Sequence, residues 1–494
     1  MKQLTGLDSA FLYLETERTP MHVGGVAILD PETPVGPLTL DALRDLIRSR
    51  LHTSATFTQK LVDVPLNLGR PYWVDDPEFD LDAHVERTQL PEPGGMRELR
   101  ALVEFEHARP LPRDRPLWYL LLVEGLEQVR GVPAGSLAII SKVHHAAIDG
   151  MSGVEMMTAL FDAEPTPREL PAPPADAANL DSSDTRPSKL RLLREMGQSL
   201  IPGTKAFGGA VGDTLRGVVR SGATWAFERV EPPPFPFTAP RSILNGAVSK
   251  ERAWDCVHLD FDRIRAVREA TSSTVNDVVL AICAGALRRY LDEEGALPDE
   301  PLVAMCPISV RTEDQKGTMG NQVSAMLVSL ATDESDAGER MERIMRSAYD
   351  SKLYNRAIGA RTLTDAGNIV PFSVAGLAAR LYTRMHLAER HRPVFNLVIT
   401  NVPGPRIPLY VAGARLRANV GLAPIFDGMG LLLAVMSYAG RLSIGVTSSP
   451  EILRDAGRFT SHFEPALGEL EESMAARHGA ATAAAESKMA GSSE

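Results

Sequence analysis

Hydrophobic residues recur along the first half of the chain in two different patterns. Apolar runs typical of strands occupy residues 23–30, 118–126 and 136–145. Residues 40–51 and 98–111 instead repeat their apolar positions every three or four residues, which is typical of amphipathic helices. The first half is therefore predicted to combine a sheet with flanking helices.

The second half repeats this mixture after a gap. Its longest helical pattern covers residues 275–294. The strand-like runs of this half are 302–310, 324–331, 395–402, 431–438 and 442–448. Because both halves mix strands and helices in the same way, we expect a duplicated α/β (α+β) architecture with two mixed sheets.

A change of composition separates the halves. Residues 164–188 are rich in Pro, Ala, Asp and Ser and lack apolar periodicity, which indicates an extended linker. Helical patterns with basic flanks follow; they fit packing between domains or contact with an anionic membrane surface. The expected divisions are an N-terminal domain 1–165, a Pro-rich and then helical linker 166–250, a C-terminal domain 251–475 and a flexible tail 476–494.

Composition narrows the possible partners. The 494 residues carry a formal net charge of -11, which indicates that nucleic acid is not the main partner. The three cysteines have no CxxC spacing and predict neither a zinc site nor a disulfide framework. The N-terminus lacks the apolar core of a secretory signal, and no uncharged stretch reaches the length of a membrane-spanning helix. Any contact with lipid is therefore expected to be peripheral.

The candidate chemistry lies at the end of the strand predicted over 136–145, where the sequence reads HHAAIDG from His144 to Gly150. Adjacent residues of a strand point to opposite sides, so His144 and His145 are not expected to serve the same small site. One imidazole should face a cleft, where it is placed to take a proton from a bound hydroxyl.

Other chemistries fit this segment less well. The zincin pattern HExxH is absent, and adjacent histidines on a strand make poor ligands to one metal ion. Ser152 does not stand in a nucleophile elbow, and no glycine-rich phosphate loop occurs. Direct transfer by a single general base is thus favoured over a covalent intermediate. On spacing alone, a structural role for the histidine pair remains the commoner explanation.

The motif HHAAIDG matches the HHxxxDG pattern of the CoA-dependent acyltransferase superfamily, and further segments resemble the bacterial wax ester synthase/diacylglycerol acyltransferase family. The resemblance covers about residues 3–470. The segments that carry it are LTGLDSAFLYLET, PMHVGG, VPLNLGRPYWVDDPEFDLDAHV, RDRPLWYLLLVEGL, STVNDVVLAICAGALRRYL, PISVR, GNQVSAMLVSL and NLVITNVPGP.

The resemblance implies two domains of chloramphenicol-acetyltransferase-like fold, joined by a helical linker, with the active site in a tunnel between them. It implies that His145 is the base that activates an acceptor hydroxyl for attack on a fatty acyl-CoA thioester. Acyl-CoA is then a co-substrate, and no cofactor or metal is expected. It also implies that Asp149 is structural and pairs with an arginine, for which Arg311 is the candidate, and that Gly150 permits a tight turn.

Five further positions correspond to family elements that line the site. Asn276 either stabilises the oxyanion or positions the acceptor, although Asn276 and Asp277 suit a helix N-terminal cap equally well. Pro116, Leu117 and Trp118 form the Pro-Leu-Trp element. Trp118 either shapes the acyl channel or is a core aromatic.

The substrates implied are a fatty acyl-CoA and either diacylglycerol or a long-chain alcohol. The apolar runs 363–387 and 421–437, the latter with Met429 and Met436, suit an aliphatic channel or a plain core. A cytoplasmic protein that associates peripherally with membrane or lipid inclusions is expected. Two alternatives remain at this point: a transferase that takes its acyl group from a carrier protein, and a non-catalytic lipid-binding protein.

Overall fold

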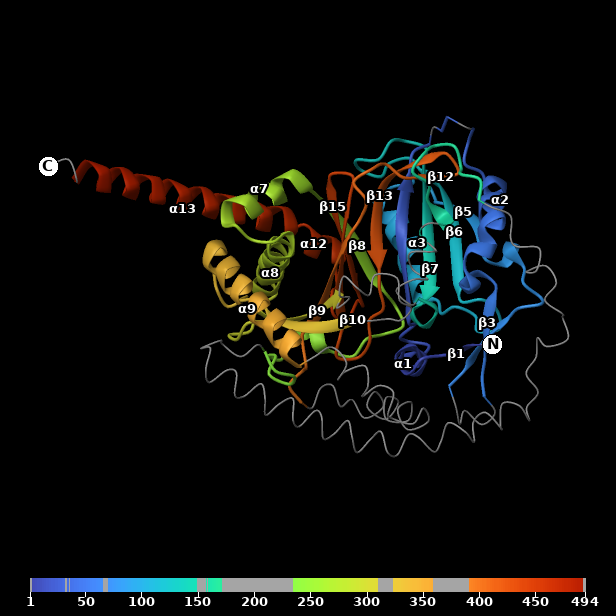
Figure 1. Ribbon diagram of the computed structural model, residues 1–494, viewed down its shortest axis with the longest axis horizontal. Coiled ribbons are helices and arrows are strands. Elements are labelled where there is room, and N and C mark those ends of the chain that lie inside the picture. The colour runs from blue at the N-terminus through green and yellow to red at the C-terminus, as the bar shows by residue number, and fades with distance from the viewer. Residues whose placement is uncertain are drawn as a thin grey trace.

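A computed structural model describes residues 2–31, 33–34, 36–64, 70–148, 157, 159–170, 234–309, 323–358 and 391–491 (Figure 1). Residues 171–233, where the sequence predicts most of the linker, lie outside the described residues. The apolar run 363–387 lies outside them as well.

The N-terminal sheet has six strands in the order β12-β13-β2-β7-β6-β5, and the first half of the chain supplies four of them. Neighbouring strands are antiparallel except β5 and β6, which are parallel. The strands are β2 (His22–Leu29), β5 (Val85–Gln89), β6 (Trp118–Leu126), β7 (Ser136–His144), β12 (Tyr410–Val411) and β13 (Ala414–Leu422).

Helices α2 (Leu40–Arg50) and α3 (Met96–Ala108) cover opposite faces of this sheet. The strand alternation explains the division, since Ile139 of β7 packs with Leu43 of α2, whereas its neighbour Ile140 packs with Leu99 of α3. The strands and helices predicted for this half are confirmed.

The second half builds another six-stranded mixed sheet, with the order β10-β9-β11-β14-β15-β8. Strand β11 runs parallel to both β9 and β14, and the other pairs are antiparallel. The strands are β8 (Ala253–Asp260), β9 (Val303–Ser309), β10 (Val323–Ser329), β11 (Leu397–Pro403), β14 (Leu431–Tyr438) and β15 (Arg441–Ser448). The five strands and the helix predicted for this half are confirmed.

A layer of helices covers one face of the second sheet (Figure 1). The central helix, α8, is buried along most of its length. The helices of this layer are α7 (Phe261–Thr271), α8 (Val275–Glu293), α9 (Ala337–Ile358), α12 (Ala456–Thr460) and α13 (Phe463–Gly491).

Strands β12 and β13 come from the second half of the sequence but complete the first sheet. Strand β13 pairs with β12 and β2, and it also contacts β14 and β15 of the second sheet. Glycines permit the close approach of the two sheets, because a Cβ added to Gly445 would lie 2.3 Å from the carbonyl oxygen of Gly421. The linear division at residue 251 does not include this exchange, since alternation shows that a segment is a strand but not which sheet it joins.

At the C-terminal end, where the sequence predicts a flexible tail over 476–494, the structure describes a helix as far as Gly491. Helix α13 continues to Gly491 and projects away from the body of the molecule (Figure 1). Ala is the most frequent residue of this stretch and has the highest helix propensity, so a helix continues there although its sequence lacks an apolar stripe.

A small three-stranded sheet, β1-β4-β3, and helix α1 (Gly6–Leu14) lie at the N-terminal end. Thr5 caps α1 by accepting the main-chain N–H of Asp8. The strands are β1 (Lys2–Gln3), β3 (Gln59–Val62) and β4 (Tyr72–Asp75). Leu4 and Leu12 pack against Ala146, directly after the histidine pair, so α1 lies on the segment that carries the candidate chemistry.

Within the residues that the structure describes, no single helix has the length and apolar character to span a membrane; only the bent pair α7 and α8, taken together, meets that test.

Candidate active site

The two histidines stand where β7 ends and a short 3-10 helix, η5 (His145–Ala147), begins. Along β7, Ser141 and Val143 line a cavity on the α2 side of the sheet, whereas Lys142 donates to the main chain of Glu106 on α3. His144 continues the α3 side. The expectation that the two imidazoles have different surroundings is confirmed.

His144 is buried, with 1% of its surface exposed. Its Nδ1 accepts the main-chain N–H of Ala146 at 3.0 Å, so this nitrogen carries no proton and the ring is in its Nε2–H form. The Nε2 atom lies 3.3 Å from Oε1 of Glu15. The main-chain N–H of His144 donates to the carbonyl of Leu117 at 2.9 Å. His144 thus organises the turn and does not face the cavity.

His145 has a partly exposed side chain that stacks on Phe11 of α1. The ring centroids are 3.7 Å apart and the planes differ by 12°. Its main-chain N–H donates to the carbonyl of Met21 at 2.8 Å. Burial lowers the pKa of His145 to about 4, with a smaller lowering from His144. The imidazole is therefore neutral near pH 7, which is the form that accepts a proton from a hydroxyl.

Two further histidines lie behind the motif. His22, opposite His144 in the sheet, places Nε2 3.1 Å from Nδ1 of His107, whose Nε2 lies 3.0 Å from the carbonyl oxygen of Ala423. Because that carbonyl only accepts, the proton of His107 is on Nε2, and His22 donates to Nδ1. Burial lowers the pKa of both histidines, to about 3 for His107, so His22 and His107 are neutral near pH 7.

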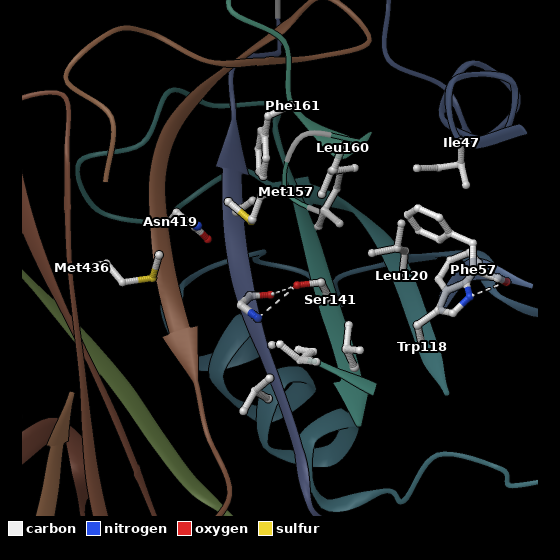
Figure 2. Close-up of a pocket in the computed structure, with 17 residues that line it drawn as sticks. Ile47, Phe57, Trp118, Leu120, Ser141, Met157, Leu160, Phe161, Asn419 and Met436 are labelled. Carbon is white, nitrogen blue, oxygen red and sulfur yellow. Dashed lines mark hydrogen bonds between the residues drawn. The ribbon is translucent and has the colours of Figure 1, made fainter. Parts of the chain in front are cut away.

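An apolar cavity of about 200 Å³ adjoins the histidine turn (Figure 2). It reaches Val143 and Ile148, on either side of His145 in the sequence. Met436 of β14 closes one side, so both sheets contribute to the wall. The residues that line it are Val23, Gly24, Gly25, Ala27, Ile47, Phe57, Trp118, Leu120, Ile139, Ser141, Val143, Ile148, Met157, Leu160, Phe161, Asn419 and Met436.

The polar side chains of the cavity are few. Ser141 Oγ accepts the N–H of Gly25 at 3.0 Å and lies 3.3 Å from the carbonyl of the same residue. Asn419 extends from β13 (Figure 2). The remaining side chains are hydrocarbon, thioether or aromatic, which suits an aliphatic ligand. Of the two methionines predicted for a channel, Met436 lines this cavity, whereas Met429 is buried in a separate core.

The Pro-Leu-Trp element supports both the turn and the cavity. Trp118 lines the cavity and is also a core residue, with 1% of its surface exposed. Its indole N–H donates to the carbonyl of Phe57 at 3.0 Å, and its ring stacks on His84. Leu117 holds His144 through its carbonyl, while Pro116 is buried before it. Trp118 is thus a core residue that also lines the cavity, and its part in an acyl channel stays a prediction.

The Asn-Asp element divides into two roles. Thr274, not Asn276, caps α8, and the carboxylate of Asp277 returns to the main-chain N–H of Thr274 at 2.9 Å. This reciprocal cap accounts for Asp277. The side-chain carbonyl of Asn276 accepts Nδ2 of Asn401, at the end of β11, at 3.3 Å. Its part in substrate binding stays a prediction.

The predicted pair of Asp149 and Arg311, and the turn at Gly150, lie outside the described residues. A different buried ion pair holds the segment that follows. Arg50 of α2 donates to Asp162 at 2.6 Å and to the carbonyl of Ala159 at 3.0 Å. Both side chains of this pair are at least 97% buried. The pair fixes the cavity-lining residues around Leu160 against α2.

Sequence reasoning did not find Glu15, His22, His107 or Arg50 as parts of the site. Glu15 and His22 fall in segments that carry the family resemblance, which was the only signal for them. Among the described residues, no cluster of three His, Cys, Asp or Glu side chains is arranged to hold a metal ion.

Comparisons with known proteins cover nearly the whole chain. The family model for the wax ester synthase/diacylglycerol acyltransferase catalytic domain matches residues 4–279. The model for the WS/DGAT C-terminal domain matches residues 319–471.

Relatives of similar length are enzymes by name. A Mycobacterium tuberculosis H37Rv protein with the provisional name diacylglycerol O-acyltransferase Rv1760 is 34% identical over 485 residues, which is 96% of this chain and 90% of the relative. The O-acyltransferase WSD of Acinetobacter baylyi is 32% identical over 465 residues, covering 94% of this chain and 96% of the relative.

Solved structures agree with these matches. The wax ester synthase/diacylglycerol acyltransferase of Marinobacter aquaeolei VT8 superposes with a TM-score of 0.68 at 31% identity, covering 96% of this chain and all of that one. The first condensation domain of the CDA synthetase gives a TM-score of 0.52 at 15% identity over 96% of both chains, which shows a shared fold.

Proposed function

The chain belongs to the wax ester synthase/diacylglycerol acyltransferase family and is an acyltransferase, and from this premise we propose that it moves a long-chain acyl group from acyl-CoA to the hydroxyl of diacylglycerol or a long-chain alcohol. The observation that carries the proposal is the position of His145. It is a neutral imidazole on the turn that follows Val143 and precedes Ile148 in the sequence, and both of those residues line an apolar cavity.

The proposed reaction is direct transfer with His145 as general base. The imidazole takes the proton of the acceptor hydroxyl while the hydroxyl oxygen forms a bond to the thioester carbonyl carbon. The carbon–sulfur bond then breaks, and the departing CoA thiolate takes the proton from His145. The products are an ester and CoA, so proton and electrons balance, and the reaction needs no cofactor besides the acyl-CoA substrate.

The cavity supports an aliphatic substrate. Its walls are apolar except near Ser141 and Asn419, and burying CH₂ groups there is favourable by about 0.8 kcal/mol each. Substrates of this kind partition into lipid. We therefore propose that the protein acts in the cytoplasm at the surface of a membrane or lipid inclusion, with peripheral contact.

The test is ester formation by the purified protein from palmitoyl-CoA with either hexadecanol or a diacylglycerol. We expect the wild type to release CoA and form ester, and the variant His145→Ala to form it at least about 100-fold more slowly. His52→Ala, at an exposed histidine of the same half, is the matched control and should behave as wild type.

Each outcome decides a separate point. The preferred acceptor identifies the physiological reaction. No ester with either acceptor would contradict the acyl-CoA assignment and favour a carrier-bound donor or a binding role. Full activity of His145→Ala would contradict the assignment of the base.

A further inference from the structure

Helix α1 contacts three consecutive residues of the histidine turn. Its C-terminal cap, Glu15, meets His144; Phe11 stacks on His145; and Leu12 packs against Ala146. The helix therefore holds the turn along its length.

Glu15 is the polar centre of this contact. One carboxylate oxygen, Oε1, lies 3.3 Å from Nε2 of His144 and accepts the main-chain N–H of Met21 at 3.2 Å. The other, Oε2, accepts Nη2 and Nε of Arg113 at 2.6 and 3.1 Å. The side chain of Glu15 is only 8% exposed, whereas that of Arg113 is 44% exposed.

Electrostatics keep this carboxylate ionised. Burial alone would raise the pKa of Glu15, but its contacts with His144 and Arg113 outweigh burial and lower the pKa to about 2. The carboxylate is therefore a permanent acceptor at neutral pH. It has no proton to give as an acid, and its low pKa makes it a weak base, so neither role in the reaction suits it.

The contacts form a continuous path to the base. A carboxylate at Nε2 stabilises the tautomer of His144 that has its proton there, and this leaves Nδ1 free for the N–H of Ala146. The Met21 residue that donates to Glu15 also accepts the main-chain N–H of His145 through its carbonyl. Glu15 thus fixes His144, which precedes His145 in the sequence, and Met21, which accepts the main-chain N–H of His145.

We propose that Glu15, held by Arg113, is a positioning residue for His145, acting through the Nε2–H tautomer of His144 and the main chain of Met21. This inference rests on the proposed function, since it takes His145 as the base. Glu15 touches neither substrate in this scheme; its effect is on where the base stands.

The first measurement is the tautomer of His144 in protein labelled with ¹⁵N-histidine. Long-range ¹H–¹⁵N spectra separate protonated from unprotonated ring nitrogens, and His144→Gln identifies the signal. The wild type should show the Nε2–H form. Glu15→Ala should show a mixture of tautomers, and Glu15→Gln, whose amide oxygen still accepts, should stay closer to wild type.

The second measurement is steady-state kinetics on the same proteins. A displacement of the base by about 1 Å lowers rates by up to about 100-fold, so we expect kcat of Glu15→Ala to fall about 10- to 100-fold while KM for acyl-CoA stays within about twofold. Glu15→Gln should lie between that variant and wild type. Glu17→Gln removes an exposed acid two residues away and is the matched control.

Two results would overturn the proposal. One is a kcat within about twofold of wild type in Glu15→Ala. The other is a fall in kcat that follows a fall in melting temperature while the tautomer stays unchanged, which would make Glu15 merely structural. If Glu15→Ala does not fold, Glu15→Gln answers both questions. A wild type without activity would contradict the proposed function alone, because the tautomer is measured without substrate.

Discussion

The two six-stranded sheets have similar layouts but different cores. Around β7 the N-terminal sheet buries four basic side chains, which are His22, His107, Lys142 and His144. The core beside α8 in the C-terminal half is almost entirely hydrocarbon, and Ile282 and Leu287 in it have no exposed surface. A buried polar group is costly unless it is paired. The C-terminal half also buries polar side chains, such as Arg340 and Asn396, but its described residues hold no comparable cluster of buried histidines. The comparison indicates that one half carries the chemistry and the other supplies rigidity and one wall of the cavity.

The largest effect expected from this comparison is on stability. Arg50→Ala leaves the carboxylate of Asp162 buried without its main partner, and Arg168, 3.4 Å from the other oxygen and half-exposed, replaces it only in part. We expect a loss of about 3 kcal/mol or more. Leu287→Ala should cost about 2–5 kcal/mol through the cavity it creates.

Urea unfolding measures both losses, and activity separates the two regions. At a temperature where both variants are folded, Leu287→Ala should keep the wild-type kcat, whereas Arg50→Ala should lose activity because Leu160 and Phe161 line the cavity. Equal kcat values in the two folded variants would contradict the inference that the N-terminal half carries the chemistry and the C-terminal half supplies rigidity.

A smaller effect is expected from the cavity itself. Met157 lines it and is 40% exposed, so Met157→Trp can fill space without straining a closed core. We expect kcat/KM for palmitoyl-CoA to fall about tenfold, close to 1.4 kcal/mol, and kcat/KM for butyryl-CoA to change little. An equal fall for both chain lengths would place the long chain elsewhere.

The smallest effect concerns pH. Because the pKa of His145 is lowered to about 4, the base stays neutral down to pH 6, and kcat/KM should be nearly constant from pH 8 to pH 6. A base with an ordinary pKa of about 6.5 would be roughly three-quarters protonated at pH 6 and would lose about fourfold in rate. An acid limb centred near pH 6.5 would contradict the lowered pKa of His145.

Stability sets the lower limit of that pH range. Below about pH 6.5 the unfolded chain binds protons at its histidines, whereas His107 and His145 bind them in the folded state only near pH 3 and 4. Stability therefore falls as the pH decreases through this window. Circular dichroism at each pH distinguishes unfolding from titration of the base.

Much of the architecture could be predicted from local patterns. Strand-like apolar runs identified β7 and β14, the helical period identified α2 and α8, and the motifs identified the family, which the comparisons confirm. These features depend on residues close together in the sequence.

The features that were missed depend on long-range contacts. Glu15 meets Arg113, and His107 meets Ala423 more than 300 positions away. The hydrophobic periodicity of a sequence does not indicate which distant residues contact one another. The Asn-Asp element shows the same limit at short range: a cap was foreseen, but only the structure shows that Thr274 and Asp277 form it and leave Asn276 to meet Asn401.

The exchange of β13 has a consequence for dividing the molecule. A chain cut between residues 171 and 233 would yield two fragments, of which the first lacks the partner that covers one edge of β2. That edge would present unpaired main-chain groups and invite aggregation, while the second fragment would carry a strand with no sheet to join. Neither fragment is a self-sufficient module, so pieces co-expressed from such a cut should recover a folded enzyme only by reassembling through β13.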